Sequence, residues 1–97
     1  LQRYLRPPFG AYDQRVLEAA GREGYQVIYW SLDSCDWRAD MTAEDIVRRV
    51  GEQANPGDIV IFHCYPAKTA EALPRVLARW HERQVRAGSI SQLLERQ

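Results

Sequence analysis

Two continuous apolar runs constrain the fold of this chain more than any other feature. Val27-Ile28-Tyr29-Trp30 and Ile59-Val60-Ile61-Phe62 consist of β-branched and aromatic residues. Runs of this length and composition are typical of strands that are buried on both faces, as in a parallel sheet. They begin about thirty residues apart, which is the size of a β-α-β unit. We therefore expect an α/β protein with a parallel sheet.

Two helices are expected in the first half of the chain, each with its own capping residue. Asp13 can accept a hydrogen bond at the start of a helix that closes at Gly24. Thr42 and Asp45 resemble a capping box, although aspartate replaces the usual Glu or Gln. The Asn-Pro-Gly turn at 55–57 is expected to end this second helix.

The remaining segments continue the alternation of strands and helices. Tyr4-Leu5 is a weaker candidate strand, and 85–90 is weaker still because it contains a glycine. A third helix is expected to begin within several residues of Thr69, because Pro74 fits a helix only in its first turn. Ser91 is expected to cap a short closing helix. The expected order is β-α-β-α-β-α-β-α, which makes four βα units.

Length and charge exclude several classes of protein. The 97 residues suffice for a single domain, residues 1–97, with one modest core. Thirteen basic residues balance thirteen acidic ones, so composition offers no case for binding nucleic acid or an anionic membrane. No apolar run approaches the ~18 residues of a membrane span, and no basic-then-apolar signal segment is visible. The two cysteines allow one disulfide or two thiols.

Functional side chains gather where the expected strands end. Arg6 precedes a rigid Pro-Pro-Phe-Gly turn. Asp33 and Asp36 flank a tight loop after the first apolar run, and His63 directly follows the second. Because the carboxyl ends of parallel strands meet at one edge of a sheet, we expect these side chains to meet there. A histidine beside a carboxylate can act as a general acid near neutral pH. The fork of Arg6 suits a carboxylate partner, either Asp33 or Asp36.

Structural interpretations stand beside the functional ones. One of the two aspartates can form an Asx turn with nearby backbone amides. Trp37 either packs or faces a ligand, and His81 is expected on a solvated helix surface. Cys35, Cys64 and His63 together would be a conceivable zinc site, but their spacing matches no compact ligand signature.

The motifs, taken in order, resemble the carboxyl-terminal half of the polysaccharide deacetylases. This family is carbohydrate esterase family four, also called the nodulation-protein-B homology domain. The matching segments are the Arg-Pro-Pro-aromatic-Gly turn at 6–10, Trp-Ser-Leu-Asp-x-x-Asp-Trp at 30–37, the Pro-Gly-Asp-Ile lead-in at 56–59 and the strand ending in His63, followed by 69–74 and 89–94. The resemblance implies part of a distorted (β/α) barrel and a secreted or cell-envelope location. It also implies removal of acetyl groups from chitin, peptidoglycan or acetylated xylan with a divalent metal, often zinc.

The resemblance also implies roles for the arginine turn and its neighbours. Arg6 would orient the catalytic base aspartate, and Asp36 would brace Arg6. Phe9 stands where tyrosine is commoner and would lend its backbone N–H to the oxyanion hole. Asp33 is expected to be a supporting residue of the same site.

The substrate-facing roles fall on three further residues. Trp37 would form a wall of the groove, and Ile61 would line the acetate pocket. His63 would protonate the leaving amine. Cys64 follows it, where the family frequently has aspartate.

The family's metal ligands are missing from this sequence. The Asp-Asp and His-x-x-x-His motifs of the family's earlier half do not occur, and the two histidines, His63 and His81, are eighteen positions apart. A half barrel leaves sheet edges and apolar surface open. We therefore expect self-association, or completion by an amino-terminal half. Three interpretations remain: a fragment of a deacetylase, a non-catalytic glycan-binding or assembly module, and a structural remnant.

Overall fold

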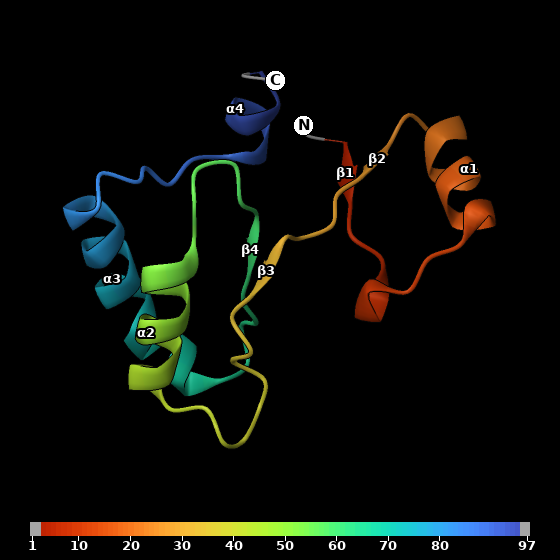
Figure 1. Ribbon diagram of the computed structural model, residues 1–97. Helices are drawn as coiled ribbons and strands as arrows, with labels where there is room; N and C mark the ends of the chain where they lie inside the picture. Colours follow the sequence, from red (N-terminus) through yellow and green to blue (C-terminus); the bar gives the residue numbers. More distant parts are fainter. Residues whose placement is uncertain (1–2, 96–97) are drawn as a thin grey trace.

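The β structure consists of two short parallel strand pairs (Figure 1). The structure is a computed structural model that describes residues 3–95. Strand β1 (Tyr4–Leu5) pairs with β2 (Gln26–Val27), and β3 (Leu32–Asp33) pairs with β4 (Val60–Ile61). The helices are α1 (Gln14–Arg22), α2 (Ala43–Gln53), α3 (Ala67–Glu82) and α4 (Ile90–Glu95), and a 3-10 turn, η1, spans Pro8–Gly10. The expected α/β class with parallel pairing is therefore confirmed.

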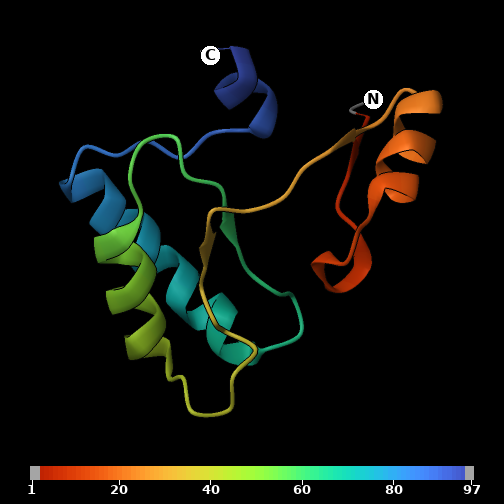
Figure 2. The same ribbon diagram turned by 45° about the vertical axis from the view of Figure 1, so that its right-hand side comes forward.

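The described chain is open rather than closed around one core. Figures 1 and 2 show α1, β1 and β2 as a smaller part, joined by residues 28–31 to a larger part that holds β3, β4, α2 and α3. The Cα radius of gyration is 14.9 Å. A compact domain of this length would have a radius of about 12.5 Å. The excess reflects the sideways projection of the smaller part.

The main core lies between α2 and α3. Ile46 and Val50 of α2 and Ala72 and Val76 of α3 have no exposed surface. Each pair is spaced four residues apart, so each lies on a single helical stripe. Partly buried residues pack around them: Leu32, Met41, Ala43, Val47, Val60, Phe62 and Trp80. The helix pair thus covers β3 and β4.

Local capping explains where the first two helices begin. The Asp13 carboxylate accepts a hydrogen bond from the Val16 N–H at 3.1 Å, which starts α1. At the start of α2, the Thr42 hydroxyl accepts from the Asp45 N–H and the Asp45 carboxylate accepts from the Thr42 N–H, at 3.1 and 3.0 Å. Both predicted caps are confirmed.

The predicted place of Pro74 in the third helix is wrong, whereas the helix starts two residues before Thr69, within the expected range. Helix α3 begins at Ala67 after Pro66, so Pro74 lies in its interior instead of its first turn. The extended backbone of Pro66 lets the helix start immediately after it, before Thr69 is reached. Ser91 does not cap α4 either, because the Ser89 hydroxyl accepts from the Gln92 N–H at 3.1 Å.

The expected strands are shorter and shifted. Only Val27 of the first apolar run lies in a strand, because residues 28–31 cross between the two parts of the chain. No strand forms at 85–90 within the described residues. There the Val85 N–H donates to the Trp80 carbonyl at 2.8 Å, which closes the end of α3.

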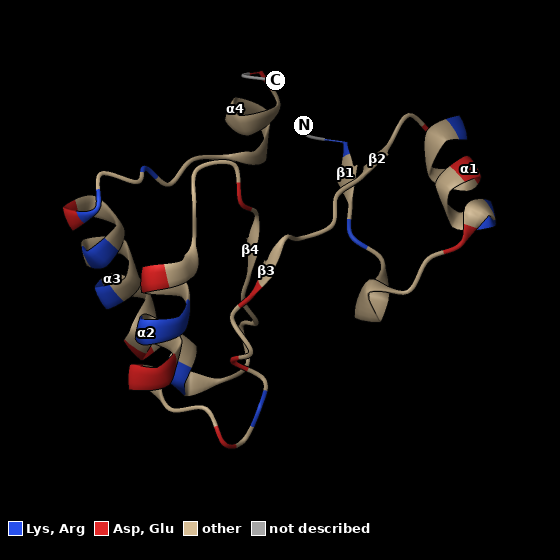
Figure 3. Cartoon of the chain, viewed as in Figure 1, with Lys and Arg blue, Asp and Glu red and all other residues tan. Residues whose placement is uncertain are grey.

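Charges of both signs are interleaved over the helices (Figure 3). Arg79 of α3 pairs with Glu52 of α2 at 2.6 Å, and Arg75 pairs with Glu44 at 2.5 Å. These exposed pairs join the outer faces of α2 and α3 above the core. Within residues 3–95, no helix is long and apolar enough to cross a membrane.

Candidate functional site

The loops that follow β3 and β4 lie next to each other and bring Asp36 and His63 into contact. Asp33 is opposite Ile61 in the parallel register, so the chain leaves both strands at the same edge. The His63 Nδ1 atom lies 2.8 Å from the Asp36 Oδ1 atom. The contact joins residues 27 positions apart in the sequence. The expected meeting of a histidine and a carboxylate at the strand ends is present in the structure.

Asp36 is a fully buried carboxylate with three hydrogen-bond donors around it. Its exposed fraction is 0%. Its Oδ2 atom accepts from the His63 backbone N–H at 2.7 Å and from the Thr69 hydroxyl at 2.6 Å, while Oδ1 faces the His63 ring. The carboxylate therefore holds both the backbone and the ring of His63.

Hydrogen bonding outweighs burial at this carboxylate. Burial alone would raise the pKa of Asp36, because it disfavours the charged form. The hydrogen bonds from the His63 N–H, Thr69 and the His63 ring, with the attraction of a charged His63, act in the opposite direction and lower the pKa below its usual value of 3.8. Asp36 is therefore an anion near neutral pH.

The other side of the His63 ring is accessible. The side chain is 35% exposed, and the ring of Tyr65 lies against it edge-on, with centroids 5.6 Å apart. A carboxylate anion at Nδ1 favours the tautomer that carries the proton on Nδ1. Nε2 is then the nitrogen that can exchange a proton with a substrate, and none of the described residues hydrogen-bonds to it.

Asp33 has the structural role that was expected for one of the two aspartates. Its Oδ1 atom accepts from the Cys35 N–H at 2.8 Å, which forms an Asx-type turn. Cys35 has a φ of 59°, in the left-handed region, and this lets the loop turn back toward Asp36. Arg49 of α2 donates to the Asp33 carbonyl at 2.8 Å. Asp33 thus shapes the loop that presents Asp36.

Arg6 does not pair with either aspartate in this structure. It donates to the Tyr29 carbonyl at 3.3 Å, and its guanidinium carbon lies 5.7 Å from the centroid of the Trp30 ring. The reason is that Arg6 follows β1, which pairs with β2 in the smaller part, whereas Asp36 follows β3. The expected brace between Arg6 and Asp36 is therefore absent.

Arg6 borders a different hollow of the surface. A groove of about 780 Å³ lies between the turn at 54–60 and the tail at 84–93, and Arg6 lines it. Asp36 and His63 are not part of that groove. The arginine and the histidine thus belong to separate regions of the described chain.

Phe9 lies in η1 with a left-handed backbone and an exposed side chain. Its φ is 59°, and within the described chain its N–H is not among the hydrogen-bonded amides, unlike those of Gly10 and Ala11. Gly10 follows with a φ of 66°, and a Cβ there would lie 2.6 Å from the Trp30 ring. This close approach requires glycine at the turn.

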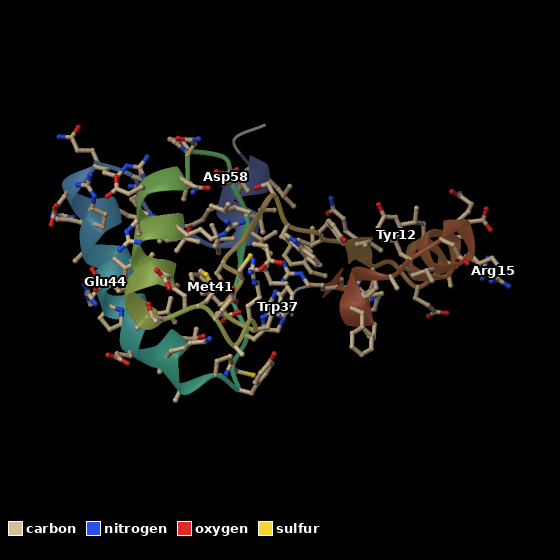
Figure 4. The ribbon with its side chains drawn as sticks, turned by 60° about the horizontal axis from the view of Figure 1, so that its bottom comes forward. Tyr12, Arg15, Trp37, Met41, Glu44 and Asp58 are labelled. Carbon is tan, nitrogen blue, oxygen red and sulfur yellow. The ribbon has the colours of Figure 1, made fainter. Side chains whose placement is uncertain are left out.

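The two residues expected to face the substrate differ in exposure. Trp37 is 52% exposed and directly follows Asp36. Figure 4 shows it on the side of the larger part that faces the smaller part, where Tyr12 lies. Ile61, at the end of β4, is buried.

The described residues do not fit a metal site. Among residues 3–95, no group of three or more His, Cys, Asp or Glu side chains is arranged to hold an ion. Cys35 and Cys64 are free thiols. A zinc site built from these cysteines and His63 is thus not formed, and the cysteines do not form a disulfide.

Thr69 is a site residue that the sequence interpretation missed. The sequence pattern places it at the start of a helix, yet its hydroxyl contacts Asp36 across 33 sequence positions. The available signal was its place in the first turn of the helix after β4, because that turn lies at the same sheet edge as His63. Lys68 beside it donates to the carbonyls of Arg38 and Met41, at 2.5 and 2.6 Å, and ties α3 to the loop before α2.

Comparison of the sequence with known proteins finds glycan deacetylases. A peptidoglycan-N-acetylmuramic acid deacetylase of Bacillus subtilis is 36% identical over 72 residues, which is 72% of this chain and 27% of that protein. A peptidoglycan-N-acetylglucosamine deacetylase of Bacillus cereus is 35% identical over 95 residues, which is 93% of this chain and 44% of that protein. Other relatives are named chitooligosaccharide and chitin deacetylases. No sequence-family profile matches the chain.

A solved structure gives the same family. A pseudoenzyme of carbohydrate esterase family four from Bacillus anthracis superimposes with a TM-score of 0.86 and 29% identity, over 95% of this chain and 32% of that one. The parallel α/β fold of this chain thus has counterparts in carbohydrate esterase family four. The chain belongs to the polysaccharide deacetylases, carbohydrate esterase family four. It spans from about a quarter to less than half of the length of the first curated relatives that it matches.

Proposed function

We propose that this chain supplies the proton-donating side of a polysaccharide deacetylase that hydrolyses N-acetyl or O-acetyl groups on chitin, peptidoglycan or related glycans. The observation that carries the proposal is the contact between the buried Asp36 carboxylate and the partly exposed ring of His63, at 2.8 Å. Relatives named as deacetylases of peptidoglycan and chitin support the substrate class.

The proposed chemical role follows from the contact between the two side chains. Asp36 holds the His63 ring at Nδ1, and Nε2 of that ring donates a proton to the amine that leaves when an amide bond is hydrolysed. The same contact keeps the ring in one orientation. Hydrolysis also needs an activated water, and the family supplies it with a divalent metal. The described residues do not hold such an ion, so the rest of the site has to come from outside them.

The remaining predicted residues take supporting roles in this proposal. Trp37 is a wall of the glycan groove, and Ile61 lines the acetate pocket. The backbone N–H of Phe9 stabilises the oxyanion, and Arg6 orients the base of the completed site. Their support is their position in motifs that resemble those of the family.

We further propose that the chain is the carboxyl-terminal part of a (β/α) barrel that is completed by an amino-terminal half or by a second copy. The large radius of gyration and the partial coverage of the relatives support this proposal. Size-exclusion chromatography with light scattering tests the pairing of copies. A monodisperse monomer with one cooperative melting transition would contradict it.

A graft tests the catalytic proposal directly. Residues of this chain replace the aligned 95 residues of the Bacillus cereus deacetylase, and acetate release from peptidoglycan is measured. We expect activity in the graft and a loss of about 100-fold or more in kcat for His63→Ala, since general acid catalysis contributes about 10²–10⁴-fold. His81→Ala, on the exposed surface of α3, is the matched control and should leave the rate unchanged.

The match to a pseudoenzyme favours a second candidate function, a glycan-binding module without catalysis. An inactive graft that still binds chitooligosaccharide, with binding lost in Trp37→Ala, would select this candidate. Equal activity of the graft with and without His63 would contradict the proton-donor role.

A further inference from the structure

Thr69 is a buried polar side chain whose hydroxyl points away from its own helix. It is 4% exposed and lies in the first turn of α3. Its hydroxyl donates to the Asp36 Oδ2 atom at 2.6 Å, the same oxygen that accepts the His63 backbone N–H. A threonine in a helix can instead point to solvent or bond to the carbonyl four residues before it. The hydroxyl is thus committed to the carboxylate beside the histidine.

We propose that Thr69 is a positioning residue for His63, and that it acts by fixing the orientation of the Asp36 carboxylate that holds the His63 ring. This inference rests on the proposed function of His63 as proton donor. The hydrogen bonds from which it is argued all lie within this chain.

The physical reason lies in how a buried anion is stabilised. Asp36 is out of contact with water, so its charge depends entirely on the donors that face it. Within the described chain those donors are the Thr69 hydroxyl and two groups of His63, and His63 is the only titratable side chain that contacts the carboxylate. Removal of the hydroxyl leaves His63 alone to stabilise the anion. The carboxylate then holds a proton more tightly.

The position of Thr69 also determines the shape of the loop that carries His63. Both His63 and Thr69 bond to Oδ2, so the two ends of the 63–69 connection are joined through one oxygen of another loop. Loss of the hydroxyl releases one of these ends. The Asp36 carboxylate can then rotate away from the histidine ring.

The test measures the pKa of Asp36 and the tautomer of His63 by NMR in the isolated chain. Thr69→Val keeps the shape of the side chain and removes the hydroxyl, Thr69→Ala removes the hydroxyl without adding a methyl group, and Thr69→Ser keeps the hydroxyl. Val76→Ala is the matched control, because Val76 is also buried on α3 but has no side-chain group that could hydrogen-bond to Asp36.

We expect Thr69→Val and Thr69→Ala to raise the pKa of Asp36 by about 1, a tenfold change in its protonation equilibrium, because a hydrogen bond to a charged group is lost. The fraction of His63 with its proton on Nδ1 should fall in the same variants. Thr69→Ser should fold and match the unmodified chain. Val76→Ala should lower the melting temperature without moving either quantity.

Several results would overturn the inference. An unchanged Asp36 pKa in either hydroxyl-free variant means that Thr69 only fills space. A pKa that moves in Thr69→Ser, or equally in Val76→Ala, means that packing and not the hydroxyl is responsible. Where the hydroxyl-free variants do not fold, an Asp36 pKa that moves in Thr69→Ser still overturns the inference.

The test of Thr69 as a positioning residue and the test of His63 as a proton donor can fail independently. An inactive graft together with the expected NMR pattern refutes the catalytic role and leaves the positioning role intact. An active graft whose Thr69→Val variant has an unchanged Asp36 pKa and an unchanged pH profile refutes the positioning role alone.

Discussion

Replacement of Asp36 by alanine tests whether the site is also a structural centre of the fold. The substitution leaves the His63 N–H and the Thr69 hydroxyl without their acceptor. Each buried donor left unsatisfied costs about 1–3 kcal/mol, so the two together cost about 2–6 kcal/mol. His63 is partly exposed and water can reach its side, so the lower half of this range applies.

Urea unfolding followed by tryptophan fluorescence and circular dichroism measures the lost free energy of unfolding. In a thermal melt, one kcal/mol corresponds to about 4–8 °C for a domain of this size, so the melting temperature should fall by at least about 8 °C. Asp40→Ala is the control. Its carboxylate is exposed and pairs with Arg38 at 2.7 Å, and such surface pairs contribute about 0–1 kcal/mol.

A double variant sharpens the comparison. Once Thr69→Val has removed the orphaned hydroxyl, Asp36→Ala should cost about 1–3 kcal/mol less than it does alone. Additive costs, or an Asp36→Ala variant as stable as Asp40→Ala, would refute the view that the carboxylate organises these loops.

Three further changes have expected outcomes. Because the pKa of Asp36 is lowered in the folded protein, its carboxylate contributes its full stabilisation above about pH 4. This contribution is lost as the pH falls through the folded-state pKa. The urea midpoints of the unmodified chain should therefore drop more steeply in acid than those of Asp36→Ala. Thr42→Ala removes one half of the capping box of α2 and should cost about 1 kcal/mol by urea unfolding, whereas Thr42→Ser should cost little. Gly10→Ala places a Cβ atom at a backbone φ of 66° and against the Trp30 ring. The melting temperature should therefore fall by an amount equivalent to about 1–3 kcal/mol. An unchanged melting temperature would contradict the close approach of residue 10 to Trp30.

Short-range features could be predicted from the sequence because their causes lie within a few residues. The caps at Asp13 and Thr42 depend on groups three positions away, so both follow from local pattern. The start of α3 depends on Pro66, whose extended backbone competes with the capping preference of Thr69. There the local rule points to the wrong residue.

Long-range features could be predicted only in part. The meeting of Asp36 and His63 follows from parallel strands that end at the same sheet edge, so the order of strands and helices was sufficient to infer it. The separation of Arg6 from Asp36 depends on how the chain bends through residues 28–31, which no local pattern encodes. The ends of the strands likewise depend on which neighbours are present to pair with them.

The Asp36 oxygen that is shared by His63 and Thr69 has a consequence for how the surface around His63 can change. The place of His63 is fixed from outside its own loop, at both ends of the connection. Cys64 and Tyr65, which lie between those ends, are both exposed. Their side chains can therefore be exchanged to reshape the surface beside the histidine while the histidine keeps its position. A library that randomises these two positions would vary the surface beside His63 and leave its contact with Asp36 in place.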